Sequence, residues 1–200
     1  MKLIIASNNK NKVREIKEIL SDHFDEIISL KEAGLDIDVI EDGATFEENA
    51  QKKAREVFAA APFADAVLSD DSGLIVDALN GAPGVYSARF AGLEHDDEAN
   101  NRKLLAVMKD VQMDNRTCRF ACAITVVRKN APELNYTGYV EGRLLFEKQG
   151  ENGFGYDPLF LYEPLNMSFA EIPSDVKNKV SHRYSALNGI LELLNREGLK

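Results

Sequence analysis

The sequence predicts a single α/β domain over residues 1–200, with a mixed sheet in a three-layer arrangement. The chain has 200 residues, of which 44% are hydrophobic, and this is enough for a sizeable core. Apolar stretches of strand length alternate with helical stretches, which favours parallel strands. Two long runs in the second half, residues 117–127 and 135–146, have the pattern of a hairpin and add antiparallel strands.

The N-terminal segment predicts a strand, a helix and a second strand. Residues 2–6 are a short apolar run and are expected to form a buried strand. Residues 7–9, Ser-Asn-Asn, are good N-cap residues, and a helix is expected to follow them as far as about Leu20. Residues 27–30 are apolar again and predict the next strand.

The middle of the chain contains a second helix and a short strand. Residues 45–48, Thr-Phe-Glu-Glu, match a capping box, so a helix should begin at Thr45 and end before Pro62. Residues 66–69 predict a short strand, and extended structure resumes at residues 74–76. Residues 80–84, Asn-Gly-Ala-Pro-Gly, predict a turn.

In the second half, Asp96 is expected to cap a helix that ends near Lys109. The predicted hairpin turns at residues 130–132, Asn-Ala-Pro. A glycine-rich loop at residues 150–157 precedes an apolar stretch at 159–161. Ser181 begins a final helix, with Leu187, Ile190, Leu191 and Leu194 on one face.

Composition excludes several classes of protein. The net charge of −9 argues against nucleic acid as a partner, because tracking a phosphate backbone requires a broad basic surface. The apolar runs are shorter than the roughly 18 residues needed to span a bilayer, and the N-terminus becomes polar at Ser7, too early for a signal peptide. Cys118 and Cys122 lie on one face of a predicted strand, too far apart to bridge. We interpret them as buried thiols in a reducing cytoplasm.

Two lysines fall on the apolar faces of predicted helices. Lys53 lies within about 20° of Phe46 on the helical wheel, and Asn49 shares that arc. Lys12 lies within the apolar arc of the first helix, whereas Lys10 lies outside it. Lysine is rarely buried unless it is paired. One interpretation is that these side chains snorkel to solvent; the other is that they face a bound anion.

Two helix starts carry positive charge, which the helix dipole disfavours unless a counter-charge is present. Lys12 is in the first turn of the first helix, where exposed backbone N–H groups already favour an anion. His182 and Arg183 follow Ser181 at the start of the last helix, and Lys177 precedes them. A solvated basic turn is the alternative in the second case. Together with Lys53 of the second predicted helix, positive charge gathers at three helices, and this favours a negatively charged ligand.

Acidic residues gather in two short segments, residues 41–43 and 70–73. Asp70 and Asp71 are adjacent in extended chain, so they should point to opposite faces and do different jobs. Carboxylates from two loops suit Mg²⁺, which takes one or two of them together with substrate phosphates. The alternative is that Asp-Asp-Ser-Gly is an ordinary turn.

Several nucleotide-binding motifs are absent from the sequence. It has no Gly-x-x-x-x-Gly-Lys-Ser/Thr motif, and the glycines at 150, 153 and 155 lack the dinucleotide-binding spacing. These glycines surround Phe154 and Tyr156, however, and a loop of this kind is suited to stacking on a planar base.

Six short blocks of the sequence, taken in order, resemble those of the inosine/xanthosine triphosphate pyrophosphatases, which remove deaminated purine nucleotides. Each block is modestly specific, and six in the right order are very specific. Asn8 departs from the glycine that is usual in the family, but asparagine also tolerates left-handed backbone. The blocks are residues 7–12, 41–54, 70–74, 81–89, 153–158 and 177 with 181–183.

The resemblance implies an elongated two-lobed fold with the active cleft between the lobes, a homodimer, and Mg²⁺-dependent cleavage between the α and β phosphates, with Mn²⁺ as a possible substitute. It implies that Asp71 activates water, that Glu41 and Asp71 hold the metal, and that Lys53 acts beside them in catalysis. The residues expected at the substrate are Ser7, Asn8, Asn9, Lys10, Asn11, Lys12, Asn49, Ser72, Phe154, Gly155, Tyr156, Asp157, Lys177, His182 and Arg183.

The resemblance also implies that Lys12, Lys53 and Asn9 hold the triphosphate and that Phe154 stacks on the base. Hypoxanthine and xanthine present a 6-oxo acceptor, whereas adenine presents a 6-amino donor. A fixed donor such as Arg183 would therefore favour the oxo purines. Two alternatives remain open at this point: a pyrophosphatase for another modified nucleotide, such as a methylated pyrimidine triphosphate, and a non-catalytic nucleotide sensor.

Overall fold

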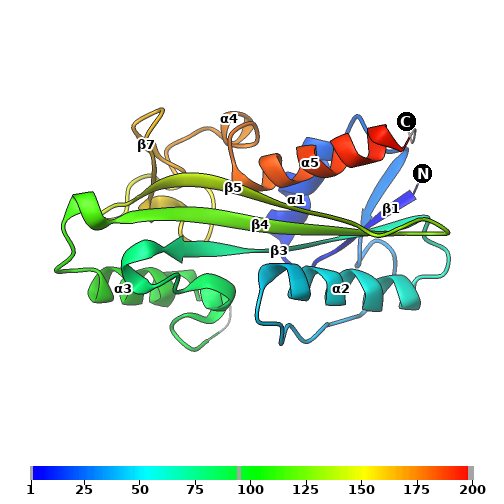
Figure 1. Cartoon of the computed structure of the whole chain (residues 1–200), viewed down its shortest axis with the longest axis horizontal. Coiled ribbons are helices and arrows are strands. Elements are labelled where there is room, and N and C mark those ends of the chain that lie inside the picture. The colour runs from blue at the N-terminus through cyan, green and yellow to red at the C-terminus, as the bar shows by residue number, and fades with distance from the viewer. Residues whose placement is uncertain (1, 94–95, 198–200) are drawn as a thin grey trace. The chain divides into compact units, whose positions relative to one another are not determined.

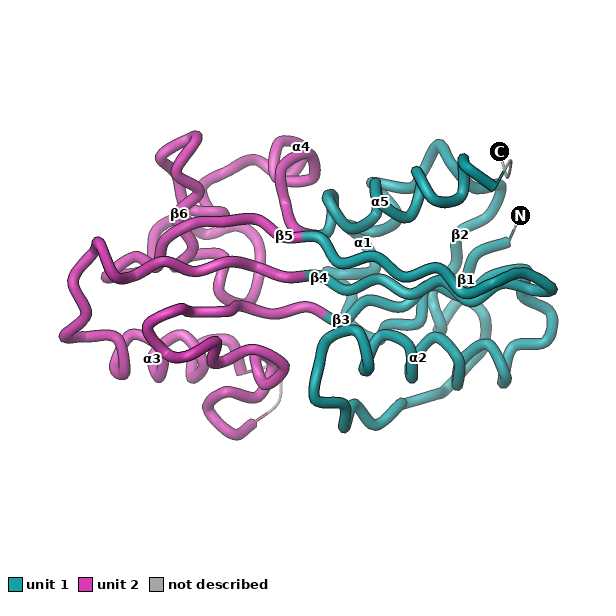
Figure 2. The backbone as a smooth tube through the Cα atoms, viewed as in Figure 1, with its two compact units in different colours: residues 1–71, 122–138, 183–200 teal, residues 72–121, 139–182 magenta. Residues whose placement is uncertain are grey.

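The computed structural model describes residues 2–93 and 96–197, which fold as two compact units. Unit 1 comprises Met1–Asp71, Cys122–Gly138 and Arg183–Lys200, and unit 2 comprises Ser72–Ala121 and Tyr139–His182 (Figure 2). The chain passes from one unit to the other four times, once between His182 and Arg183 and three times within long strands. These strands are β3 (Ala66–Val76), β4 (Thr117–Arg128) and β5 (Leu134–Leu144).

The strands of the described chain form one mixed sheet in the order β2-β1-β3-β4-β5-β6-β7. In unit 1, β1 (Lys2–Ala6) pairs in parallel with β2 (Glu26–Ser29) and with β3. In unit 2, β6 (Phe160–Tyr162) pairs antiparallel with β5 and with β7 (Met167–Ser168). The mixed α/β sheet predicted from the sequence is confirmed.

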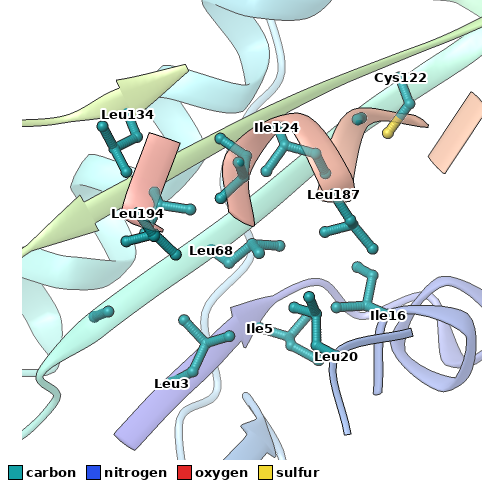
Figure 3. Close-up of a cluster of buried hydrophobic side chains, with 14 residues drawn as sticks. Leu3, Ile5, Ile16, Leu20, Leu68, Cys122, Ile124, Leu134, Leu187 and Leu194 are labelled. Atoms are coloured by element: carbon teal, nitrogen blue, oxygen red, sulfur yellow. The ribbon is translucent and has the colours of Figure 1, made fainter. Parts of the chain in front are cut away.

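Unit 1 has three layers, because β1 is apolar on both faces. Leu3 and Ile5 point to one side, where they pack with residues of α1 (Lys10–Leu20) and α5 (His182–Arg196) (Figure 3). Ile4 points to the other side and packs with Val57 of α2 (Phe46–Ala60). Figure 1 shows α1 and α5 on one face of the sheet and α2 on the other.

Unit 2 has a core of its own, built on Leu74, Leu104, Phe120, Phe160 and Phe169. Its helices are α3 (Asp97–Val107) and α4 (Ser174–Lys177), with short 3₁₀ turns at Asp77–Leu79, Gly84–Arg89, Met113–Asn115 and Asp157–Leu159.

Arg116 organises the end of α3 in unit 2. Its guanidinium is buried and donates to the carbonyl oxygens of Met108, Val111, Leu144 and Leu145, at 2.6 to 3.3 Å. These bonds satisfy a buried cation with backbone acceptors. They also tie the end of α3 to the segment that leads into the glycine-rich loop.

Most predicted elements are confirmed within a few residues. The predicted interruption between the strand at residues 66–69 and the extended structure at residues 74–76 is wrong. The segment Asp70-Asp71-Ser72-Gly73 is the middle of the continuous strand β3 and makes no turn. Gly73 is required by a close approach, because a Cβ there would lie 2.3 Å from Ser87 Oγ. In residues 2–93 and 96–197 we find no helix long and apolar enough to cross a membrane.

Candidate functional site

Strand β3 places its two neighbouring aspartates in different surroundings. Asp70 is fully buried, and Asp71 is 7% exposed. Successive side chains of a strand point to opposite faces, so the two carboxylates meet different helices. Asp70 bonds to side chains of α1 and α5, and Asp71 bonds to a side chain of α2. That they do different jobs stays a prediction.

Asp70 is the centre of a buried charge network in unit 1. Its Oδ1 lies 2.6 Å from Lys12 Nζ, and its Oδ2 accepts from Arg183 Nε and Cys122 Sγ, each at 2.9 Å. Arg183 also forms an ion pair with Glu15 of α1. Burial disfavours ionisation of Asp70, but Arg183 and Lys12 outweigh it and hold the pKa of Asp70 well below its usual value.

Lys12 is attracted electrostatically by both aspartates. Burial disfavours its charged form, but the attraction of Asp70 and Asp71 is stronger and raises the pKa of Lys12. Asp70 is therefore the counter-charge that the first turn of α1 requires. Lys12 therefore faces a carboxylate of the protein, and the interpretation that it faces a bound anion stays a prediction.

Asp71 is oriented by Asn49 of α2. Asn49 Nδ2 donates to Asp71 Oδ2 at 3.0 Å, and Asn49 Oδ1 accepts from Gly43 N at 2.8 Å. A single amide therefore joins the acidic loop at residues 41–43 to the strand. Gly43 has no room for a side chain, because a Cβ there would lie 2.7 Å from Asn49 Oδ1.

The pKa of Asp71 is raised to about 6. Burial is the largest cause, and repulsion from Glu41 adds to it. Lys12, Lys53 and the hydrogen bond from Asn49 act in the opposite direction. A carboxyl group with a pKa near neutrality can accept a proton at physiological pH and can also give it up.

Lys53 and Glu41 form an ion pair beside Asp71. The side chain of Lys53 is 12% exposed, so it does not snorkel to solvent. The structure thus brings together four of the residues predicted from the sequence. These are Lys12, Glu41, Lys53 and Asp71, all in unit 1.

The N-terminus of α1 is capped by the protein itself. Asn9 Oδ1 accepts from the backbone N–H groups of Asn11 and Lys12, at 3.0 and 3.2 Å. Ser7 Oγ accepts from Asn9 N, and Asn8 Nδ2 donates to Ile37 O. The expectation that the N–H groups at this helix start are exposed to an anion is therefore wrong for Asn11 and Lys12. Lys10 is exposed.

The donor set suits a hard divalent cation held with the help of a ligand. In the part of the chain that the structure describes, no three carboxylate, imidazole or thiol groups gather as they would around a protein-only metal site. Mg²⁺, however, commonly takes only one or two carboxylates together with phosphate oxygens and water. Glu41 and Asp71 repel each other, and a cation between them would relieve that repulsion.

In unit 2 the glycine-rich loop is fixed around Asp157. Its Oδ2 accepts from Phe154 N at 2.9 Å and lies 2.5 Å from Lys177 Nζ. Gly153 must be glycine, since a Cβ there would lie 2.1 Å from that oxygen. Lys177 Nζ lies 5.1 Å from the centroid of the half-buried Phe154 ring. The ammonium of Lys177 therefore contacts both the carboxylate of Asp157 and the ring of Phe154.

Two further predicted residues of unit 2 are buried. Tyr156 is 4% exposed and donates from its hydroxyl to Ser87 O at 2.9 Å, so its ring belongs to the core and is not a stacking surface. His182 stacks on Phe120 with the ring centroids 4.7 Å apart. Of the two aromatic residues predicted to stack on a base, Phe154 is the one with an accessible ring.

The predicted base-reading residue Arg183 lies in unit 1 and is fully buried. It forms ion pairs with the carboxylates of Asp70 and Glu15. Its role at a base edge stays a prediction. So do the roles of Ser72 and Gly155, and the placement of the active cleft between two lobes.

Sequence reasoning missed Glu15, Asp97 and Asn101. Glu15 forms an ion pair with Arg183, 168 residues away in sequence. Asp97 and Asn101 bind the backbone of Gly155, which is more than fifty residues away in sequence. No local pattern reveals a partner at that separation.

Comparisons with known proteins match nearly the whole chain. The model of the Ham1 family matches residues 3–193. The dITP/XTP pyrophosphatase of Desulforamulus reducens is 49% identical over 197 residues, covering 98% of this chain and 96% of that protein. The structure of the Staphylococcus aureus Ham1 protein matches with a TM-score of 0.84 and 40% identity, covering 98% of this chain and 100% of that one. A nucleoside-triphosphatase / dITP/XTP pyrophosphatase of Mycobacterium abscessus matches with a TM-score of 0.76 and 39% identity, covering 96% and 99%.

Proposed function

Because the chain belongs to the Ham1 family, we propose that it hydrolyses the non-standard purine nucleoside triphosphates ITP, dITP and XTP to the monophosphate and pyrophosphate. One observation in this chain carries the proposal. Asp71 is a buried carboxyl group with a pKa of about 6, oriented by Asn49 and placed in the field of Lys12 and Lys53. A residue in these surroundings is suited to activating water for attack on a phosphate.

The charges of the unit 1 cluster support a metal-dependent reaction. The cluster holds four carboxylates, those of Glu15, Glu41, Asp70 and Asp71, against three cations, Lys12, Lys53 and Arg183. A triphosphate adds further negative charge, which this set cannot balance by itself. Glu41 and Asp71 would hold Mg²⁺, or Mn²⁺ in its place. The ion would supply charge neutralisation on the phosphates and a fixed geometry for the displacement.

The residues of the cluster then have separate tasks. Asp71 takes the proton of the attacking water on its carboxylate, while the water oxygen bonds to a phosphorus of the α–β anhydride and the bond to the leaving phosphate oxygen breaks. Lys12 and Lys53 stabilise the charge that develops on the phosphate oxygens. Asn49 keeps Asp71 in position, and Asp70 with Arg183 keeps Lys12 in position.

The unit 2 cluster supports recognition of a base. Phe154 offers a ring for stacking, and the ammonium of Lys177, fixed by Asp157, offers a donor. A fixed donor favours the 6-oxo group of hypoxanthine and xanthine over the 6-amino group of adenine. Guanine also carries a 6-oxo group, so its rejection requires another contact. From the family resemblance we further infer a cytoplasmic homodimer.

A substrate panel tests this function. Pyrophosphate release is measured with ITP, dITP, XTP, GTP, ATP and a methylated pyrimidine triphosphate, each with and without Mg²⁺. We expect turnover of the first three, dependent on the metal. Preference for the modified pyrimidine would redirect the assignment, and tight binding of nucleotide with no turnover would identify a sensor.

A further inference from the structure

Helix α3 binds both backbone polar groups of Gly155 in the glycine-rich loop. Asp97 Oδ2 accepts from Gly155 N at 2.7 Å, and Asn101 Nδ2 donates to Gly155 O at 2.9 Å. Asp97 and Asn101 are four residues apart, which places their side chains one above the other on a single face of the helix. A carboxylate and an amide thus bind both polar groups of the same residue.

Gly155 follows directly after Phe154, the residue with the accessible ring. The backbone of Gly155 is left-handed, with φ of +60°, a conformation that side chains disfavour and that needs external support to be the only one populated. On the other side of Phe154, its own N–H is bound by Asp157. The Phe154 ring is therefore carried by a backbone that is fixed both before and after it.

The side-chain amide of Asn101 has an energetic cost, because one of its polar atoms is buried without a hydrogen bond. The side chain is 3% exposed, and no described residue offers a donor to its Oδ1. A buried polar atom with no hydrogen bond is destabilising, and an apolar side chain at this position would avoid it. What the amide provides in return, in the contacts of this structure, is the bond to Gly155 O.

The opposite end of α3 is anchored to the segment that precedes this loop. Arg116 binds Met108 O at the end of the helix, and also Leu144 O and Leu145 O. Glu98, in the first turn of α3, forms an ion pair with Lys148. Both ends of α3 are thus tied to residues 144–148, the segment that leads into the loop.

We propose that Asp97 and Asn101 are positioning residues for nucleobase recognition: by fixing the N–H and the C=O of Gly155 they set the orientation of the Phe154 ring and hence the affinity for the purine. The inference rests on the proposed function. Neither residue belongs to the unit 1 cluster of Lys12, Glu41, Lys53 and Asp71, so we expect their removal to weaken the binding of the base and to leave that cluster unchanged.

The experiment compares four variants with the wild type: Asn101→Ala, Asp97→Ala, Asp97→Asn and Asn100→Ala. Asn100 is a matched control, because it is a neighbouring buried asparagine of α3 that binds other backbone groups, Ala91 N and Ala88 O. Asp97→Asn keeps an acceptor for Gly155 N and is the conservative rescue. Asp97 is exposed, so its variants are expected to fold even if Asn101→Ala does not.

Three quantities are measured: KM and kcat for XTP, and the inhibition constant of inorganic tripolyphosphate, which has no base. We expect Asn101→Ala and Asp97→Ala each to raise KM by about threefold to tenfold, the equivalent of one lost hydrogen bond, with kcat and the tripolyphosphate constant within about twofold of wild type. Asp97→Asn and Asn100→Ala should keep the wild-type KM. Hydrogen exchange of the Gly155 amide should accelerate in Asp97→Ala but not in Asn100→Ala.

Other results overturn the inference. If the variants match the wild type in KM, or if tripolyphosphate inhibition weakens in parallel with KM, the two residues do not act through the base. If Asn100→Ala has the same effect as Asn101→Ala, the effect is general destabilisation of α3. A wild type that hydrolyses XTP while all variants match it refutes this inference alone. A wild type that neither binds nor hydrolyses XTP refutes the proposed function together with it.

Discussion

Asn49 Nδ2 donates a hydrogen bond to Asp71 Oδ2 over 3.0 Å, joining helix α2 to strand β3 at the carboxyl group to which we assign proton transfer. The same amide accepts from Gly43, in the loop that carries Glu41. The loop at residues 41–43, helix α2 and strand β3 thus meet at one side chain.

Replacing Asp71 with asparagine should remove turnover and spare binding. The new amide would keep an oxygen that can accept from Asn49 but could not take a proton from water. We expect kcat for XTP to fall by about 100-fold to 10,000-fold, whereas the dissociation constant for tripolyphosphate should rise by less than about tenfold. Stopped-flow turnover and calorimetric binding measure the two effects. Near-normal kcat would remove Asp71 from this role.

The same variant should change the pH dependence of stability. The folded-state pKa of Asp71 is about 6, above the usual value of 3.8, so the stability that this group contributes is complete below pH 3.8 and is lost as the pH rises through 6. Asp71→Asn avoids this loss and should gain about 1 to 3 kcal/mol relative to wild type between about pH 4 and pH 8. Urea unfolding of both proteins at about pH 4 and about pH 8 measures this gain in stability. An equal difference at both pH values would contradict the assigned pKa.

The pKa of Asp71 should respond to its neighbours in opposite directions. Glu41→Gln removes a repulsive charge and should lower the pKa, whereas Lys53→Met removes an attractive charge and should raise it. A titration of the Asp71 carboxyl carbon by NMR, in the absence of metal, follows both variants. Shifts of the same sign in the two variants would show that these charges do not act on Asp71 as the structure indicates.

Arg183 should be necessary chiefly for stability. Arg183→Met leaves Asp70 and Glu15 buried without their shared cation, and we expect a loss of about 3 to 5 kcal/mol at pH 7. Ion pairing lowers the pKa of Asp70, so its stabilising effect is present above pH 3.8 and is lost as the pH falls further; the deficit of the variant should therefore shrink in acid.

Arg183→Lys is the control, since it keeps the charge and should lose less stability. The ratio of kcat/KM for XTP to that for ATP, measured in this variant, decides the base-reading role predicted from the sequence. A large fall in the ratio with little loss of stability would place the guanidinium at the base after all.

Phe154→Ala should weaken base binding. Loss of a stacking ring is worth about 1 to 3 kcal/mol, which corresponds to an increase in KM for XTP of about fivefold to 100-fold. Phe154→Tyr keeps the ring and should stay close to wild type. Tripolyphosphate inhibition should be the same in all three proteins. Weaker inhibition in Phe154→Ala would indicate that the loop also supports the phosphate-binding cluster.

The sequence predicts those features of the structure that are set by residues close to one another in the chain. Helices α1 and α2 were predictable because their caps and apolar faces repeat within a few residues, as at Thr45, whose Oγ1 accepts from Glu48 N. The inward-facing Lys12 and Lys53 were predictable from the helical wheel for the same reason.

Long-range contacts explain what the sequence did not predict. Asp70-Asp71-Ser72-Gly73 has the composition of a turn, yet it is a strand. Lys12 and Arg183 neutralise Asp70 from two helices, and the approach of Ser87 leaves no room for a side chain at Gly73. Likewise, nothing near Asn101 in the sequence indicates that its partner is Gly155.

The most direct test of the central claim is to identify the products in a mixture. Equal amounts of XTP and ATP are incubated with the protein and Mg²⁺, and phosphorus NMR follows both nucleotides. We expect the xanthosine monophosphate and pyrophosphate to accumulate in equal amounts while ATP remains. Xanthosine diphosphate with orthophosphate, or consumption of ATP at the same rate as XTP, would contradict the account.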